Sequence, residues 1–280
     1  MKYGIEIQGG EPRKVGELAR EAEEAGWDGV FIADALAMGV KGYEEMPWFD
    51  TQVALAVIAM RTERIKIGTL IMAITRRRPW KLAREMMSLD QLSRGRMILG
   101  VGLGAAEDDG GFFKVGEAMD LKVRAEIMDE TLAVVTGLWS GKPFTFSGKH
   151  YRVDEMSMVP PPVQKPRIPI WAVGVWPKEK SMQRAVRWDG IIPQRYKASP
   201  GDTARPEDTR EVALYARKNR KAGSGFDIVA GGSTPARSRK KAADKVRPFA
   251  EAGATWWIES VWSGETKLRA RIKEGPPRVE

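Results

Sequence analysis

Three glycines alternate with other residues where an apolar run ends, in the segment SLDQLSRGRMILGVGLG at 88–104. Gly100, Gly102 and Gly104 leave this strand end without side chains, so a flat ligand could lie close against the main chain. The spacing differs from the dinucleotide-binding fingerprint, because no helix begins directly after it. Packing of small residues inside a barrel is the alternative explanation for the same glycines.

Acidic residues follow two of the apolar runs and could accept or donate protons. Asp34 ends the segment WDGVFIAD at 27–34, where a carboxylate can either cap a helix or accept hydrogen bonds from a ligand. Glu107 belongs to an acidic cluster with Asp108 and Asp109 just beyond the glycines, which is either a solvated loop or part of a site. We take Asp34 and Glu107 as candidate catalytic residues, and Asp34 also as a candidate cofactor ligand.

A further glycine lies in AVGVWPKEK at 172–180, where a strand leads into a helix. Helix N-termini bind phosphate through unpaired amides, and Lys178 would add positive charge. Gly174, Val175 and Lys178 are therefore candidate cofactor-binding residues. Ordinary loop chemistry is the alternative explanation for Gly174.

The composition excludes several kinds of chemistry. Cysteine is absent, which excludes disulfides, thiolate metal sites and a cysteine nucleophile. His150 is the only histidine, so a site with several histidine ligands is excluded and a serine–histidine triad would have to use this residue. A histidine at its position, in an expected hairpin, is ordinarily a surface residue. We expect no metal site.

The net charge of +9 is spread along the chain and not concentrated in one block. Such a charge fits a solvated basic surface or a preference for anionic small ligands, and we expect no nucleic-acid partner. No apolar run reaches the roughly 18 residues of a membrane span, and MKYGIEIQGG lacks the pattern of a signal peptide. The sequence therefore predicts a soluble, cytoplasmic protein without a membrane partner.

Short apolar strands alternate with helices eight times along the chain. The expected strands lie at 3–8, 27–34, 64–74, 95–104, the end of 160–174, 189–194, 226–232 and 254–260. The expected helices lie at 11–26, 50–62, 79–93, 121–139, 178–188, 207–222, 236–252 and near 264–273. This alternation predicts a parallel sheet covered by helices. Eight units favour one α/β domain over 1–280, a TIM (β/α)8 barrel, with an open doubly wound sheet as the alternative.

Additions to this barrel are expected in two places. The segment 142–153 alternates in polarity and turns at Ser147-Gly148, which predicts a hairpin excursion. Sites of TIM barrels lie at the C-terminal ends of the strands, so the loops 35–49, 106–120 and 195–206 would form the lid and the pocket. The first loop supplies Met38, Tyr43, Met46 and Trp48, which favour a mainly apolar or aromatic substrate.

The segment RRRPWKLAREMMSLDQLSRGRMILGVGLG at 76–104 resembles the luciferase-like monooxygenase superfamily. The shared features are a helix that begins with proline, the turn Leu-Asp-x-Leu-Ser-x-Gly-Arg and the strand end Gly-Val-Gly-x-Gly. Four other segments resemble the family in the same order: 124–153, 160–174, AVRWDGIIP at 185–193 and AGATWWIES at 252–260. The resemblance covers about residues 3 to 262.

This resemblance implies a barrel that binds FMN or the deazaflavin F420 at its C-terminal face, with the ring beside Gly102 and Gly104. It also implies a non-proline cis peptide at Leu70–Ile71, so these two residues and Ala105 join the candidate cofactor-binding set. Family members are commonly dimers through their second and third helices. Here those helices carry more apolar residues than one buried stripe requires: Val53, Val57, Met60, Met86, Met87 and Leu89.

Two positions depart from the family pattern. Several members have Asp-His where this chain has Asp34-Ala35. The histidine that the light-emitting luciferases use is also absent. The branch that oxidises sugar phosphates with F420 has glutamate directly after Gly-x-Gly, where this chain has Ala105. These departures weigh against sugar-phosphate oxidation.

The resemblance therefore implies an F420- or FMN-dependent oxidoreductase or monooxygenase that acts on an apolar small molecule. F420 is slightly favoured, because its anionic tail would suit two basic clusters: Lys178, Lys180 and Arg184, and Arg76 to Arg78. One alternative is a non-catalytic flavin-binding barrel that has lost its catalytic groups. Another is a flavin-free barrel enzyme that acts on phosphorylated metabolites.

Overall fold

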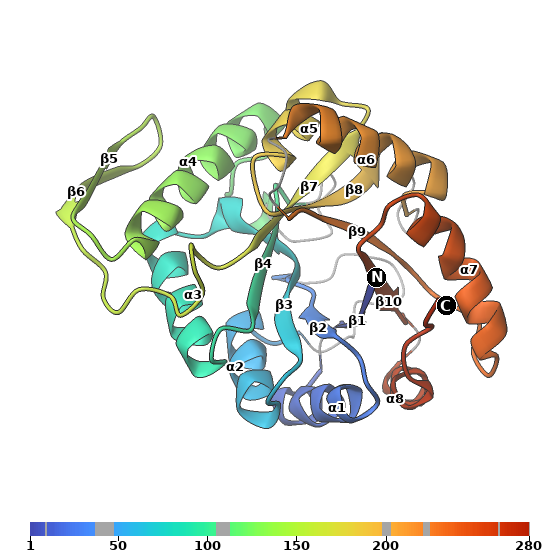
Figure 1. Cartoon of the computed structure of the whole chain (residues 1–280). Helices are drawn as coiled ribbons and strands as arrows, with labels where there is room; N and C mark the ends of the chain where they lie inside the picture. Colours follow the sequence, from blue (N-terminus) through green and yellow to red (C-terminus); the bar gives the residue numbers. More distant parts are fainter. Residues whose placement is uncertain are drawn as a thin grey trace.

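Eight parallel strands close into a barrel, with helices arranged in a ring outside it (Figure 1). The computed structural model describes residues 1–8, 10–36, 48–104, 113–197, 203–220, 225–262 and 264–279. The barrel strands are β1 Lys2–Ile7, β2 Gly29–Ile32, β3 Lys66–Ala73, β4 Met97–Gly102, β7 Ile170–Trp176, β8 Gly190–Arg195, β9 Asp227–Gly232 and β10 Trp256–Ser260. Strand β1 pairs with both β2 and β10, so the predicted TIM barrel is confirmed and the open sheet is wrong.

The helices of the ring follow the strands in the expected alternation. They are α1 Pro12–Glu24, α2 Thr51–Arg61, α3 Pro79–Leu92, α4 Leu121–Trp139, α5 Glu179–Ala185, α6 Pro206–Asn219, α7 Arg239–Glu251 and α8 Glu265–Glu274. Their starts follow local chemistry: α1 and α3 begin with proline, and the Asp50 carboxylate caps α2 by accepting from the amides of Gln52 and Val53. Each expected helix is present, with ends that differ by a few residues.

Aromatic and branched side chains fill the barrel interior. We call these buried residues the lumen cluster: Phe31, Ile98, Trp171, Ile192, Val229, Trp256 and Ile258. Glycines make room for its large rings, because a Cβ at Gly4 or Gly29 would collide with Phe31, and one at Gly190 would collide with Trp171. The lower barrel is therefore a packed core, and a ligand can be held only above it.

The Arg-Gly-Arg turn between α3 and β4 is a structural anchor on the opposite side of the barrel from the strand exits. Arg94 and Gly95 both have positive φ, which reverses the chain toward β4. The guanidinium of Arg96 donates to the carbonyls of Ala59, Thr62, Ile65 and Ser93 and to the Thr62 hydroxyl. Arg96 thus joins the end of α2, the start of β3 and the end of α3.

The predicted hairpin is confirmed as a separate two-stranded sheet that projects beyond α4 (Figure 1). Its strands are β5 Phe144–Ser147 and β6 Arg152–Met156. The Glu130 carboxylate on α4 accepts the main-chain amides of Lys149, His150 and Tyr151 and fixes the hairpin end. The His150 side chain is 18% exposed, with Nε2 3.2 Å from Glu126, so it is a partly buried residue of this hairpin and contacts α4.

The two helices expected at a dimer interface differ in what they expose. Met86, Met87 and Leu89 of α3 are buried within the protomer, so internal packing already accounts for them. On α2, Val53 and Met60 are 53% and 68% exposed, and their spacing of seven residues places them on one helix face. In the described part of the chain, no helix has the length and apolar character that crossing a membrane requires.

Candidate functional site

The mouth of the barrel, where the strands end, holds apolar side chains that no other part of the described structure covers fully. Leu70, Ile71 and Val173 pack on the lumen cluster but stay only partly buried. Strand β3 is irregular here, because its register with β4 shifts between Thr69 and Met72. The Leu70–Ile71 peptide within this shift is cis, as the resemblance implied.

The three glycines at the end of β4 and just beyond it have different local roles. A Cβ at Gly100 would collide with the main-chain oxygen of Thr69, whose hydroxyl bonds both the amide and the carbonyl of Gly100. A Cβ at Gly102 would lie 3.1 Å from Ile71 Cγ2 and 3.3 Å from Val173 Cγ2, within the mouth. Gly104 has φ +87°, a conformation that favours glycine. Of the three, Gly102 is the position where an added side chain would press on the partly buried Ile71 and Val173 of the mouth.

These roles predict different costs for adding one methyl group. Gly100→Ala should lower the free energy of unfolding by about 3 kcal/mol, because the new Cβ meets main-chain atoms that cannot move aside. Gly102→Ala should cost about 1 kcal/mol, because its neighbours are side-chain methyl groups that have to shift only slightly. Urea unfolding of both variants measures the difference, and equal losses would contradict the assignment.

Asp34 is buried and its carboxylate is fully engaged. Its side chain is 2% exposed, with Oδ1 2.7 Å from Arg77 and Oδ2 2.9 Å from Arg76. The Thr51 hydroxyl and the Ala73 amide also donate to it. This arrangement ties the end of β2 to the short 3-10 turn Ile74–Arg76 after β3. The geometry favours a role in positioning the β3 exit over the catalytic role expected from the sequence.

The segment after β7 is built differently from the sequence expectation. Gly174 faces outward, since its Cβ would meet Ile191 and Met182, so close packing against α5 accounts for this glycine. The Val175 amide donates to Ser181 Oγ, and α5 begins at Glu179 and has seven residues. The Lys178 ammonium lies 3.6 Å from the centre of the Tyr196 ring. This contact keeps the positive charge of Lys178 at the ends of β7 and β8.

Glu6 is a buried carboxyl group at the mouth that the sequence reasoning missed. Gly4, two residues earlier, faces the lumen cluster, so the alternation of a strand places Glu6 on the inner face as well. Glu6 is 8% exposed and accepts from Ser260 Oγ, 2.5 Å away. Burial raises the pKa of Glu6 to about 7, against the opposing hydrogen bonds from Ser260 and Gln8.

A pKa near 7 allows this carboxyl group to both hold and release a proton at neutral pH. The signal for it was present in YGIEIQ, where a charged residue interrupts the inward-facing positions of a buried strand. Only the neighbours Ser260 and Ile258 on β10, at the far end of the chain, show that this face is the inner one.

Several expected site residues lie outside the described part of the chain. They are Ala105, Glu107, Met38, Tyr43 and Met46, and their roles remain predictions. Trp48 is described and partly buried. Within the described ranges, no group of three or more histidine, aspartate or glutamate side chains is arranged to hold a metal ion.

Comparison with known proteins identifies relatives of this chain. An F420-dependent glucose-6-phosphate dehydrogenase of Microbacterium testaceum is 31% identical over 213 residues, which are 74% of this chain and 56% of the relative. This chain spans about half the length of the curated relatives it matches.

Solved structures share the fold at lower identity. An F420-dependent secondary alcohol dehydrogenase in complex with an F420–acetone adduct superposes with a TM-score of 0.82 at 18% identity, over 100% of this chain and 99% of the other. The FMN complex of the oxygenating constituent of 3,6-diketocamphane monooxygenase from Pseudomonas putida gives 0.74 at 16% identity, over 100% and 99%. The family model for luciferase-like monooxygenases matches residues 3–276. The chain belongs to the luciferase-like monooxygenase family.

Proposed function

We propose that this protein is an oxidoreductase that uses the deazaflavin F420 and has Glu6 as its acid–base group. The observation that carries the proposal is a buried carboxyl group with a pKa of about 7 on the inner face of the barrel mouth. The F420-dependent relatives support the choice of cofactor. An apolar or aromatic substrate remains the expectation.

The residues of the mouth fit a flat ring system. Leu70, Ile71 and Val173 form an incompletely covered apolar floor, and Gly102 adds no side chain that would press on Ile71 and Val173. These four residues would hold the ring, and the tied loop of Asp34, Arg76 and Arg77 would keep the β3 exit in place. When bound, F420 or FMN supplies a hydride acceptor or donor.

Glu6 then has a defined task. Its carboxyl group holds or releases the proton that accompanies hydride transfer at a substrate oxygen or nitrogen, while Ser260 fixes its orientation through the hydrogen bond to Oε2. The lumen cluster below Glu6 excludes water from that side. This placement supplies an acid–base group although Ala35 and Ala105 replace the family's histidine and glutamate.

The basic clusters expected to favour F420 carry less weight once their partners are known. Arg76 and Arg77 pair with Asp34, and Arg184 pairs with Asp129. Lys178 forms no ion pair with the described residues, so it is the better candidate for contact with an anionic tail or phosphate.

Competing titrations with F420 and FMN at two salt concentrations test the choice of cofactor. We expect tighter binding of F420, with an affinity that falls more steeply with salt than that of FMN, because exposed charges are screened. Tighter binding of FMN without extra salt dependence for F420 would reverse the choice. Binding of neither would contradict the proposed function.

We also propose a homodimer that buries the exposed face of α2. Met60→Glu and Val53→Glu should each convert the dimer to a monomer at micromolar concentration, because they place a charge in an apolar contact. Light scattering measures the mass. Leu214→Glu on α6 is the matched control, since Leu214 is 52% exposed on another helix and should leave the mass unchanged. A monomeric unmodified protein would contradict the proposal.

A further inference from the structure

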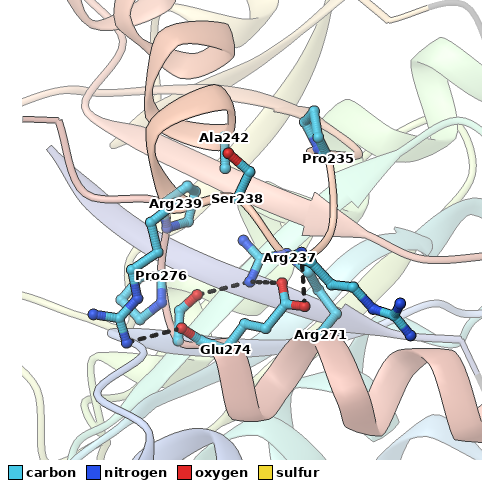
Figure 2. A pocket seen from close by; sticks show the side chains of 10 residues that line it. Pro235, Arg237, Ser238, Arg239, Ala242, Arg271, Glu274 and Pro276 are labelled. Carbon is cyan, nitrogen blue, oxygen red and sulfur yellow. Dashed lines mark hydrogen bonds and ion pairs between the residues drawn. The ribbon is translucent and has the colours of Figure 1, made fainter.

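A cavity of about 300 Å³ lies between the start of α7 and the end of α8 (Figure 2). Its lining comes from the loop before α7, the first turns of that helix, the last turn of α8 and the following tail. No lumen-cluster residue lines it, so it is separate from the barrel mouth. Its volume is at the lower end of the roughly 300–1,000 Å³ range of small-ligand pockets.

The charges around this cavity are unbalanced. Arg237, Arg239 and Arg271 line it, and Glu274 is the one acid among its ten lining residues. Arg271 is 5% exposed and is held by Glu259, Thr234 and the Gly275 carbonyl. In the part of the chain that the structure describes, no carboxylate pairs with the guanidinium groups of Arg237 and Arg239, which are exposed.

The start of α7 adds to this positive charge. The helix has no acidic residue in its first turn, and Arg239, Lys240 and Lys241 follow its N-cap Ser238 directly. Cations at a helix N-terminus oppose the positive end of the helix dipole. Ser238 Oγ accepts from the Lys241 amide, whereas the amides of Arg239 and Lys240 have no acceptor within the helix. A bound anion would relieve the repulsion and accept from these donors.

Glu274 shows where an anion is accepted. Its Oε1 accepts from the Arg237 amide at 3.0 Å, and its Oε2 lies 3.8 Å from Arg271 (Figure 2). The Arg239 guanidinium donates a hydrogen bond to the main-chain carbonyl of Glu274. A carboxylate of the protein itself therefore lies among these donors, and it competes with any anion that enters.

We propose that this cavity binds the phosphate group of a small phosphorylated molecule. Arginine side chains and helix-start amides form several charge-assisted hydrogen bonds with the oxygens of phosphate. Pro235, Pro276 and Ala242 provide an apolar wall for the remainder of such a molecule. Arg237 extends away from Glu274 in Figure 2 and has to turn toward the cavity to take part.

Calorimetric titration of the full chain with inorganic phosphate and with glycerol 3-phosphate tests the site. Arg237→Met and Arg239→Met should each weaken binding about tenfold, by loss of charge-assisted hydrogen bonds. Glu274→Gln should tighten it about threefold or more, because the competing negative charge is removed. Lys245→Met is the matched control: the residue is exposed on the same helix and does not line the cavity.

Phosphate affinity should fall in the two arginine variants and rise in Glu274→Gln. This contrast distinguishes an effect on binding from damage to the fold, since a misfolded protein does not gain affinity. A dissociation constant unchanged in Glu274→Gln, or affected equally by Lys245→Met and Arg239→Met, overturns the proposal. Tighter binding of glycerol 3-phosphate than of phosphate identifies an organic phosphate as the ligand, and equal binding identifies phosphate itself. The titrations are repeated with F420 or FMN present. Competition by either cofactor would assign the phosphate to the barrel mouth and overturn the separate site.

Discussion

Glu6→Gln should lower the rate of cofactor turnover about 100-fold or more, the usual contribution of a positioned acid or base. Glutamine keeps the size and the hydrogen bond from Ser260 Oγ but cannot exchange a proton. The variant should bind cofactor as well as the unmodified protein. The loss should therefore appear in kcat and not in cofactor affinity.

The pH profile gives a sharper test of the same residue. In the unmodified protein one limb of the profile should lie near pH 7, where Glu6 titrates, and this limb should vanish in Glu6→Gln. Ser260→Ala is the companion variant: it removes a hydrogen bond that lowers the pKa of Glu6, so the limb should move to higher pH. An unchanged profile in Glu6→Gln would contradict the acid–base role, and full activity would favour another group.

Stability provides a readout that needs no substrate. Because burial raises the pKa of Glu6 from 4.5 to about 7, the folded protein binds this proton more tightly than the unfolded chain. Protonation of Glu6 therefore stabilises the folded protein relative to the unfolded chain. This contribution is complete below pH 4.5 and is lost as the pH rises through 7. The shift corresponds to about 3 kcal/mol. Glu6→Gln should therefore be more stable than the unmodified protein at pH 8, which urea unfolding measures.

Arg96→Met should lower the free energy of unfolding by about 4 kcal/mol, among the largest effects of a single substitution in this chain. The guanidinium is buried and satisfies four main-chain carbonyls and one hydroxyl. Methionine fills much of the space but leaves those acceptors unpaired.

Arg94→Met is the matched control for this prediction, because it lies in the same turn. Its side chain is 86% exposed and its nearest carboxylate, on Glu63, is 3.7 Å away, so the change should cost less than about 0.5 kcal/mol. Urea unfolding of both variants compares the two arginines. Similar losses would show that Arg96 acts through charge and not through its hydrogen bonds.

The barrel itself was predictable because its signals are local. The alternation of apolar strands with amphipathic helices, the prolines at the starts of α1 and α3 and the hairpin turn at Ser147-Gly148 all act within a few residues. The glycines of β4 were recognised as special for the same reason. The specific role of Gly100 could not be predicted, because it depends on Thr69, which lies 31 residues earlier and on a neighbouring strand.

The candidate site was predicted less completely, because it depends on partners from distant elements. Asp34 was identified by its place at a strand end, yet its pairing with Arg76 and Arg77 requires the turn after β3. Gly174 was read as a ligand contact, whereas Met182 and Ile191 pack against its outer side. Glu6 was missed because a sequence shows alternation but not which side of a strand faces the lumen.

Titration of the purified protein with F420, followed by quenching of tryptophan fluorescence, tests the proposed function most directly when it is run beside Gly102→Leu. A leucine side chain at this position would press on Ile71 and Val173, which form part of the proposed floor of the ring site. The account therefore predicts saturable binding to the unmodified protein and at least about tenfold weaker binding to the variant. Circular dichroism confirms that both are folded. Equal binding to both, or binding of neither F420 nor FMN to the folded unmodified protein, would contradict the account.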